Sequence, residues 1–93
     1  MLTRWEGNWT FISPSGVTSG HVHKPSYTAL KVVVLRAAAA SLARLPDDEA
    51  DVMSGYWNRL RVELERTAEP AAAAGRWRYD DGNWATVTLT RTT

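Results

Sequence analysis

The chain has 93 residues, 44% of them hydrophobic and 23% charged, and its formal net charge is +1. These proportions are typical of one globular domain and exclude a wholly disordered chain. The small net charge lacks the marked basic excess of most nucleic-acid-binding proteins, and the absence of cysteine excludes disulfides and cysteine-based metal sites.

Neither a membrane span nor a secretory leader is predicted. The longest apolar stretch, VVVLRAAAASLARL, is interrupted by Arg36 and Arg44 and falls short of the roughly 18 apolar residues of a spanning helix. The N-terminal MLTRWEGNW lacks a basic segment followed by an apolar one. We therefore expect one cytoplasmic domain over residues 1–93, with no membrane association. The excess of Arg over Lys is typical of a GC-rich genome.

A β-hairpin is predicted over residues 9–23. Trp9 and Phe11 have strand spacing, and the turn sequence Ser13-Pro14-Ser15-Gly16 separates them from a second run that ends in His-Val-His. The small residues of the segment SPSGVTSG also resemble a phosphate-binding loop, but this segment contains no lysine. A hairpin turn is the favoured interpretation.

Residues 27–45 favour a helix that begins after Ser26, whose hydroxyl can cap free N–H groups. The three adjacent valines would suit a strand. Because the segment continues without a break into four alanines, we predict a helix instead. A face of large residues is expected on a sheet. A second face, rich in alanine, would let another helix approach closely, from this chain or from a partner.

A second, amphipathic helix is predicted from Asp47 to near Pro70. Asp47 is the expected N-cap, and the acids that follow it complement the positive end of the helix dipole. This role accounts for Asp48, Glu49 and Asp51, so we do not interpret them as a catalytic cluster. No phosphate-loop, dinucleotide-binding or zinc-protease motif occurs in the sequence.

The strongest strand pattern is RWRYDDGNWATVTLTRT near the C-terminus. A three-residue loop, Asp80-Asp81-Gly82, with Gly82 in the left-handed conformation, would place Trp77, Tyr79 and the following apolar residues on one face. A two-residue loop would break this pattern. The opposite face would then carry Arg76, Arg78, Trp84, Thr86 and Thr88.

The predicted fold class is therefore α+β. Its elements follow the order β-β-α-α-β-β, and two helices cover one face of a four-stranded antiparallel sheet in a two-layer sandwich. The near-repeat of RWEGNW at 4–9 and RYDDGNW at 78–84 is explained as turn chemistry that leads into a Trp-initiated strand at each end. Trp5 and Trp84 are the tryptophans that are hardest to bury in this arrangement.

His21 and His23 have the only metal-like spacing, because alternate residues of a strand point to the same side. A third ligand is not evident nearby, although Asp47, Asp48 or Asp51 could contribute one. We therefore expect no metal site, and no cofactor is predicted.

The favoured function is a non-catalytic interaction or regulatory module that contacts a protein partner or a second copy of itself as a homo-oligomer. Its candidate contact residues are Arg76, Arg78, Trp84, Thr86 and Thr88. One alternative is a nucleic-acid-binding protein that uses Arg76, Arg78, Trp84 and Arg91, because exposed Trp beside Arg suits base stacking. A second alternative is a small metal-dependent enzyme that uses His21 and His23.

Overall fold

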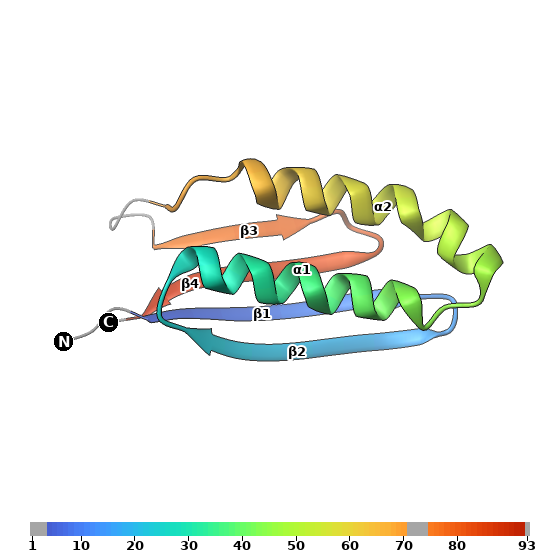
Figure 1. Cartoon of the computed structure of the whole chain (residues 1–93), viewed down its shortest axis with the longest axis horizontal. Coiled ribbons are helices and arrows are strands. Elements are labelled where there is room, and N and C mark those ends of the chain that lie inside the picture. Colours follow the sequence, from blue (N-terminus) through green and yellow to red (C-terminus); the bar gives the residue numbers. More distant parts are fainter. Residues whose placement is uncertain (1–3, 71–74, 93) are drawn as a thin grey trace.

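The computed structural model describes residues 4–70 and 75–92 and confirms the predicted order of elements (Figure 1). In chain order they are β1 (Arg4–Ser13), β2 (Gly16–Lys24), α1 (Tyr27–Ala43), α2 (Asp47–Arg66), β3 (Arg76–Asp80) and β4 (Ala85–Thr92).

The four strands form one antiparallel sheet in the order β2-β1-β4-β3. The first and last strands of the chain, β1 and β4, are thus neighbours at its centre, and β2 and β3 form its edges. Both helices lie on the same side of this sheet (Figure 1). The predicted two-layer α+β fold is therefore correct.

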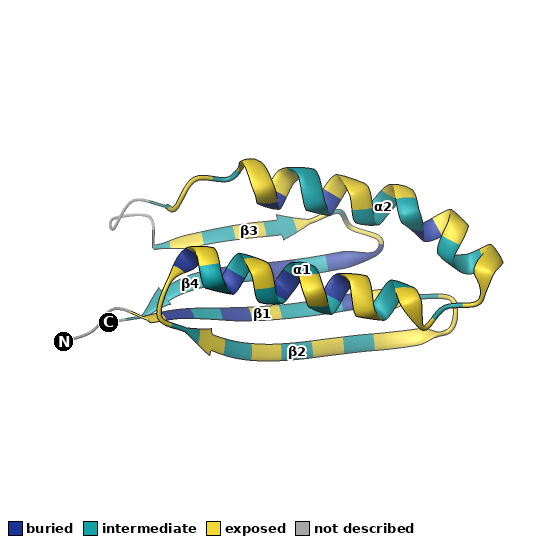
Figure 2. Cartoon of the chain, in the orientation of Figure 1, coloured by how far each residue is buried: buried dark blue, intermediate teal, exposed yellow. Residues whose placement is uncertain are grey.

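The hydrophobic core lies between the helices and the covered face of the sheet (Figure 2). Strand alternation places Trp5 and Phe11 of β1 on this face, where they pack with apolar residues of β4. The helices contribute side chains at helical spacing, which makes one continuous core. Its largest fully buried aliphatic residues are Leu30, Val34, Leu60, Leu64, Val87 and Leu89.

Gly7 shows why the interpretation of RWEGNW as a turn is wrong. Gly7 and Asn8 lie inside β1, which begins at Arg4 rather than at Trp9. A Cβ atom on Gly7 would lie 2.8 Å from Cδ1 of Leu30, so the absence of a side chain lets α1 approach the sheet closely. The same early start of β1 buries Trp5, which is only 2% exposed.

The loop between β3 and β4 does contain a turn, but it is longer than predicted. It spans 81–84, and Tyr79 is paired with Val87. Oδ1 of Asp81 accepts hydrogen bonds from the backbone N–H groups of Asn83, Trp84 and Ala85 at 2.7–3.0 Å. Gly82 has φ of +71°, so its predicted left-handed conformation is confirmed.

The two helix starts differ in how they are capped. The hydroxyl of Ser26 accepts from the N–H of Ala29 at 3.1 Å, as predicted. Asp47 is not an N-cap, because it is the first residue of α2 and Pro46 occupies the cap position without a side-chain hydrogen bond. The acids of this first turn still lie where the helix dipole favours negative charge.

Helix α1 does not pack its alanine face against α2. Tyr27, Leu30, Val34 and Ala38 are its buried residues, which confirms three members of the predicted large-residue face. On the other side Ala39, Ala40 and Ala43 are exposed. Neither of the two described helices combines the length and the apolar character of a bilayer-crossing segment.

Candidate functional site

The face of the sheet opposite the helices is covered by no described element, and we call it the open face (Figure 1). Strand pairing assigns its residues, because members of a cross-strand pair point to the same side. They are Arg4, Glu6, Asn8, Thr10, Ile12, Val17, Ser19, His21, His23, Arg76, Arg78, Asp80, Thr86, Thr88, Thr90 and Thr92.

Four of the five predicted contact residues share this open face. Arg78 is paired with Thr88. The next pair on this face in one direction contains Arg76, and the next pair in the other direction contains Thr86. The face is thus a polar surface of threonine hydroxyls and arginines on a stiff sheet. Arg78 lies 3.3 Å from Asp80, and because both side chains are about half exposed, this ion pair adds little stability.

Trp84, the fifth predicted residue, lies in the core instead. It is 2% exposed and stacks on Phe11, with ring centroids 5.0 Å apart and an interplanar angle of 15°. Its carbonyl oxygen accepts a hydrogen bond from the N–H of Ile12 at 2.8 Å, which joins the end of the β3–β4 loop to β1. The alternation failed here because Trp84 belongs to the Asp81-centred loop and not to β4.

Arg91 is also absent from the open face. Its guanidinium lies 5.3 Å from the centroid of the Trp5 ring and 3.3 Å from a carboxylate oxygen of Glu69, on the covered side. Two of the four residues of the nucleic-acid alternative therefore lie away from the other two. All five tryptophans of the sequence pack in or against the core, so the described open face offers no tryptophan for base stacking.

Glu6, His21 and His23 form a cluster on the open face that sequence reasoning missed. One ligand atom from each lies within 4.8 Å of the other two. Oε1 of Glu6 is 3.0 Å from Nε2 of His21, and the two imidazole centroids are 4.8 Å apart. The expectation that a third ligand is missing is therefore wrong.

The third group comes from β1 and not from the acids that begin α2. Antiparallel pairing sets Glu6 beside His23, with His21 next to Asn8. Asp47, Asp48 and Asp51 are not members of the cluster. The pairing register of the first hairpin could have identified Glu6, but this required extending β1 back through Gly7 to Arg4.

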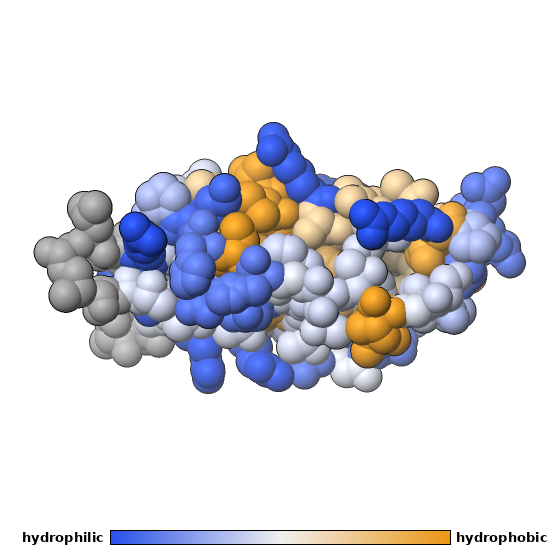
Figure 3. Space-filling model, turned by 90° about the horizontal axis from the view of Figure 1, so that it is seen from below, coloured by the Kyte–Doolittle hydropathy of each residue, from blue (hydrophilic) through white to orange (hydrophobic). Residues whose placement is uncertain are grey.

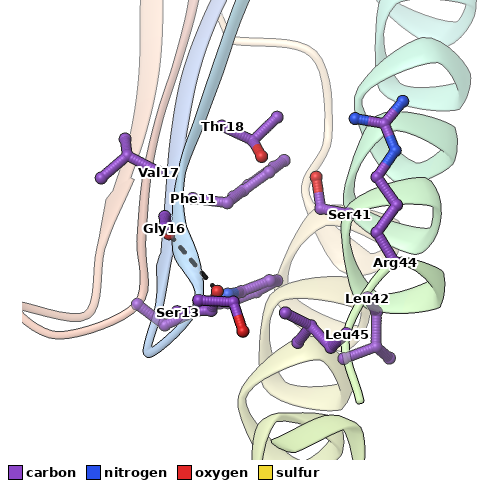
Figure 4. A pocket seen from close by; sticks show the side chains of 11 residues that line it. Phe11, Ser13, Gly16, Val17, Thr18, Ser41, Leu42, Arg44 and Leu45 are labelled. Atoms are coloured by element: carbon purple, nitrogen blue, oxygen red, sulfur yellow. Dashed lines mark hydrogen bonds between the residues drawn. The ribbon is translucent and has the colours of Figure 1, made fainter.

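Two hollows lie on opposite sides of the first hairpin. A shallow depression of about 420 Å³ on the open face is bordered by His21, Asn8 and Thr88. A pocket of about 250 Å³ lies between the β1–β2 turn and the end of α1, with Ser41 and Arg44 among its lining residues (Figure 4).

The turn Ser13-Pro14-Ser15-Gly16 beside that pocket is a hairpin turn, as favoured from the sequence. Ser13 pairs with Gly16, and its hydroxyl donates to the carbonyl oxygen of Gly16 at 3.3 Å (Figure 4). The hydroxyl of Ser15 donates to Oε2 of Glu49 at 2.5 Å. A carboxylate at this position disfavours a phosphate.

The two described groups with clearly shifted pKa values face the core. Burial, reinforced by the charge of Glu69, raises the pKa of Tyr27 to about 12. Burial, followed by the charge of Asp81, also raises the pKa of Tyr79. Both shifts are explained first by desolvation in the core rather than by a reactive pair.

The two edges of the sheet differ in length and charge. β2 is nine residues long, and its only Lys, Arg, Asp or Glu residue is Lys24 at its end. β3 is five residues long and carries Arg76, Arg78 and Asp80. Comparison with known proteins adds no relative to this description: no family model, curated protein or solved structure matches the chain.

Proposed function

We propose that the protein is a small non-catalytic interaction module that pairs with a second copy of itself along the free edge of β2. The observation that carries this proposal is the contrast between the two edges of the sheet. An edge strand presents unpaired N–H and C=O groups that can accept another strand, and proteins commonly block such edges with charge or short length. β3 has both features, whereas β2 is long and carries charge only at its last residue, Lys24.

Charge favours a second copy as the occupant. In an antiparallel pair related by a two-fold axis, β2 meets its own sequence, so any like charges in mid-strand would face one another. The central residues, Val17 to His23, contain no Lys, Arg, Asp or Glu. Two sheets of four strands could therefore join into one continuous sheet without this repulsion.

The charged edge at β3 limits the assembly to two copies. A protein with two open edges risks extending into a filament, because each added copy presents a new edge. Here each copy would offer one long edge with uncharged central residues, β2, and this edge is covered once two copies have paired. The proposal is therefore a closed dimer.

Apolar surface beside the edge adds to the proposal. Figure 3 looks onto the β2 side and shows hydrophobic surface gathered above the strand, toward α1, whereas the sheet side is largely hydrophilic. Val17, near the start of β2, is itself 66% exposed. Removing such surface from water on pairing would contribute to the association free energy.

Nucleic-acid binding is not part of the proposal. Its four-residue surface required Trp84 and Arg91 beside Arg76 and Arg78, and the first two lie on the covered side. The predicted contact arginines and threonines of the open face lie on β3 and β4, beyond β1 from the β2 edge, so the proposed pairing does not use them.

Analytical ultracentrifugation of the wild type and of Ser19→Lys tests the proposal. Ser19 is exposed near the middle of β2, so a lysine there would place like charges close together in a two-fold pair. We expect a dimer for the wild type at micromolar concentration. Because like-charge contacts cost several kcal/mol, we expect Ser19→Lys to raise the dissociation constant by about tenfold or more.

Thr88→Lys is the matched control. It adds the same charge to the same face, but on the inner strand β4, and should leave the dimer intact. A wild-type monomer at several hundred micromolar, or equal weakening by both substitutions, would contradict the proposal.

A further inference from the structure

We propose that Glu6, His21 and His23 form a binding site for a divalent transition-metal ion, with Zn²⁺ as the ion of choice. The three ligand atoms lie within 4.8 Å of one another on the open face. This inference goes beyond the proposed dimer and does not depend on it, because all three residues belong to one hairpin of one chain.

The donor set matches the ion. Two imidazoles and one carboxylate make a common protein ligand set for zinc, which binds nitrogen and oxygen donors readily. Calcium and magnesium prefer oxygen donors only, so this set discriminates against them. The remaining coordination positions face away from the sheet and are open to water.

The distances need only side-chain adjustment. With metal–donor bonds of about 2.0–2.2 Å, donors around a tetrahedral ion lie roughly 3.3–3.6 Å apart. Glu6 and His21 are already at 3.0 Å, so His23 has to move closer by about an ångström or more. The His21 side chain is 44% exposed, and His23 is also exposed, so rotation meets little packing resistance.

The backbone beneath the site is fixed. The β1–β2 pairing runs without interruption from Trp5 with Lys24 to Ser13 with Gly16, so the three Cβ positions are set by a regular ladder. Leu30 packs against Gly7, between Glu6 and Asn8, and holds this part of β1 on α1. A site on paired strands loses less entropy on binding than one on a loop.

Surrounding charge sets a moderate affinity. Glu6 is the only anion among the three ligands, and Arg4, the adjacent open-face residue on β1, is a cation. Lys24 follows His23 in sequence but is paired with Trp5 and points to the covered side. The neighbouring Asn8 and Thr90 are neutral. We therefore expect a micromolar rather than a nanomolar dissociation constant.

Isothermal titration of the untagged full chain with ZnCl₂, in a non-chelating buffer at pH 7.5, tests the site. An untagged chain is essential because a polyhistidine tag itself binds zinc. We expect one ion per chain with a micromolar dissociation constant, and little heat with MgCl₂. NMR spectra should show the imidazole signals of His21 and His23 shifting together with the titration.

The variants Glu6→Gln and His23→Ala distinguish this site from scattered weak binding. Each removes one ligand, from a half-buried position for Glu6 and an exposed one for His23. Each should weaken binding by about tenfold or more, since even outer-shell partners of a metal account for that much. Asp80→Asn is the matched control, because it removes an open-face carboxylate on β3. Circular dichroism checks that each variant is folded.

Binding weaker than about 100 µM in the wild type would overturn the proposal. So would an affinity that Glu6→Gln leaves unchanged, since the two histidines alone would then account for the binding. Sedimentation in the presence of EDTA keeps this test separate from the dimer, which should persist after the metal is removed.

Discussion

The two hairpins of the sheet contribute one edge each, yet they are built in opposite ways. The first is long and has a tight turn, and its edge strand, β2, carries no charge between Val17 and His23. The second has a short, charged edge, β3, and a loop that is anchored by Asp81 and sends Trp84 into the core. The difference teaches that the two edges of one sheet can be built differently: β3 is short and charged, whereas the central residues of β2 carry no charge.

The covered and open faces of the first hairpin repeat this division of roles. Gly7, on the covered face, allows Leu30 of α1 to pack closely against β1. Glu6 and His21, on the open face, meet across the strands at 3.0 Å. Neighbouring residues of one strand thus serve packing on one side and a candidate ligand site on the other.

Replacing Trp84 with alanine should have the largest effect, because it removes the indole that stacks on Phe11 at the end of the core. We expect the free energy of unfolding to fall by about 3–5 kcal/mol, as for other buried aromatic residues. Urea denaturation followed by circular dichroism measures this change.

Trp77→Ala is the comparison on the edge strand. Trp77 is only half-buried on β3, so its removal should cost less, about 1–3 kcal/mol. The faces assigned from the sequence placed Trp84 on the exposed side and Trp77 in the core, so they implied that Trp77→Ala would cost more stability than Trp84→Ala. A melt in which Trp84→Ala is silent would contradict the position of Trp84.

Replacing Gly82 with valine should have a smaller effect, confined to the loop of the second hairpin. Its φ of +71° is poorly tolerated by a β-branched residue, so we expect a cost of about 1–2 kcal/mol. Gly82→Asn is the control, because asparagine adopts this conformation more readily. Thermal denaturation should rank the wild type above Asn and Asn above Val; equal midpoints would refute the turn geometry.

Local chemistry explains which features of the fold could be predicted. The Ser26 cap and the left-handed conformation of Gly82 depend on a few adjacent residues, and both were predicted correctly. Strand alternation likewise gave Trp77, Tyr79 and Val87 a common face. These features need no knowledge of distant parts of the chain.

Two of the errors concern residues whose main packing partners lie far away in the chain. Gly7 resembles a turn residue until Leu30, from α1, is placed against it. Trp84 resembles a strand residue until Phe11 stacks on it. Sequence spacing alone does not reveal such partners.

Two of the three residues of the candidate metal site were singled out from the sequence, although no metal site was expected. The spacing of His21 and His23 within one strand was visible, but Glu6 joins them only through the pairing of β1 with β2. A hairpin register drawn back to Arg4 would have supplied it. The uncharged edge of β2 likewise became a candidate surface only when the strand order placed β2 on the outside.

Hydrogen exchange of the backbone amides at two protein concentrations tests the β2-edge dimer most directly. Amides whose N–H groups point outward from β2, between Val17 and His23, should exchange more slowly at several hundred micromolar than at low micromolar concentration. Amides of β3, between Arg76 and Asp80, should exchange at the same rate at both concentrations. Protection that is independent of concentration in β2, or that rises in β3 instead, would contradict the proposal.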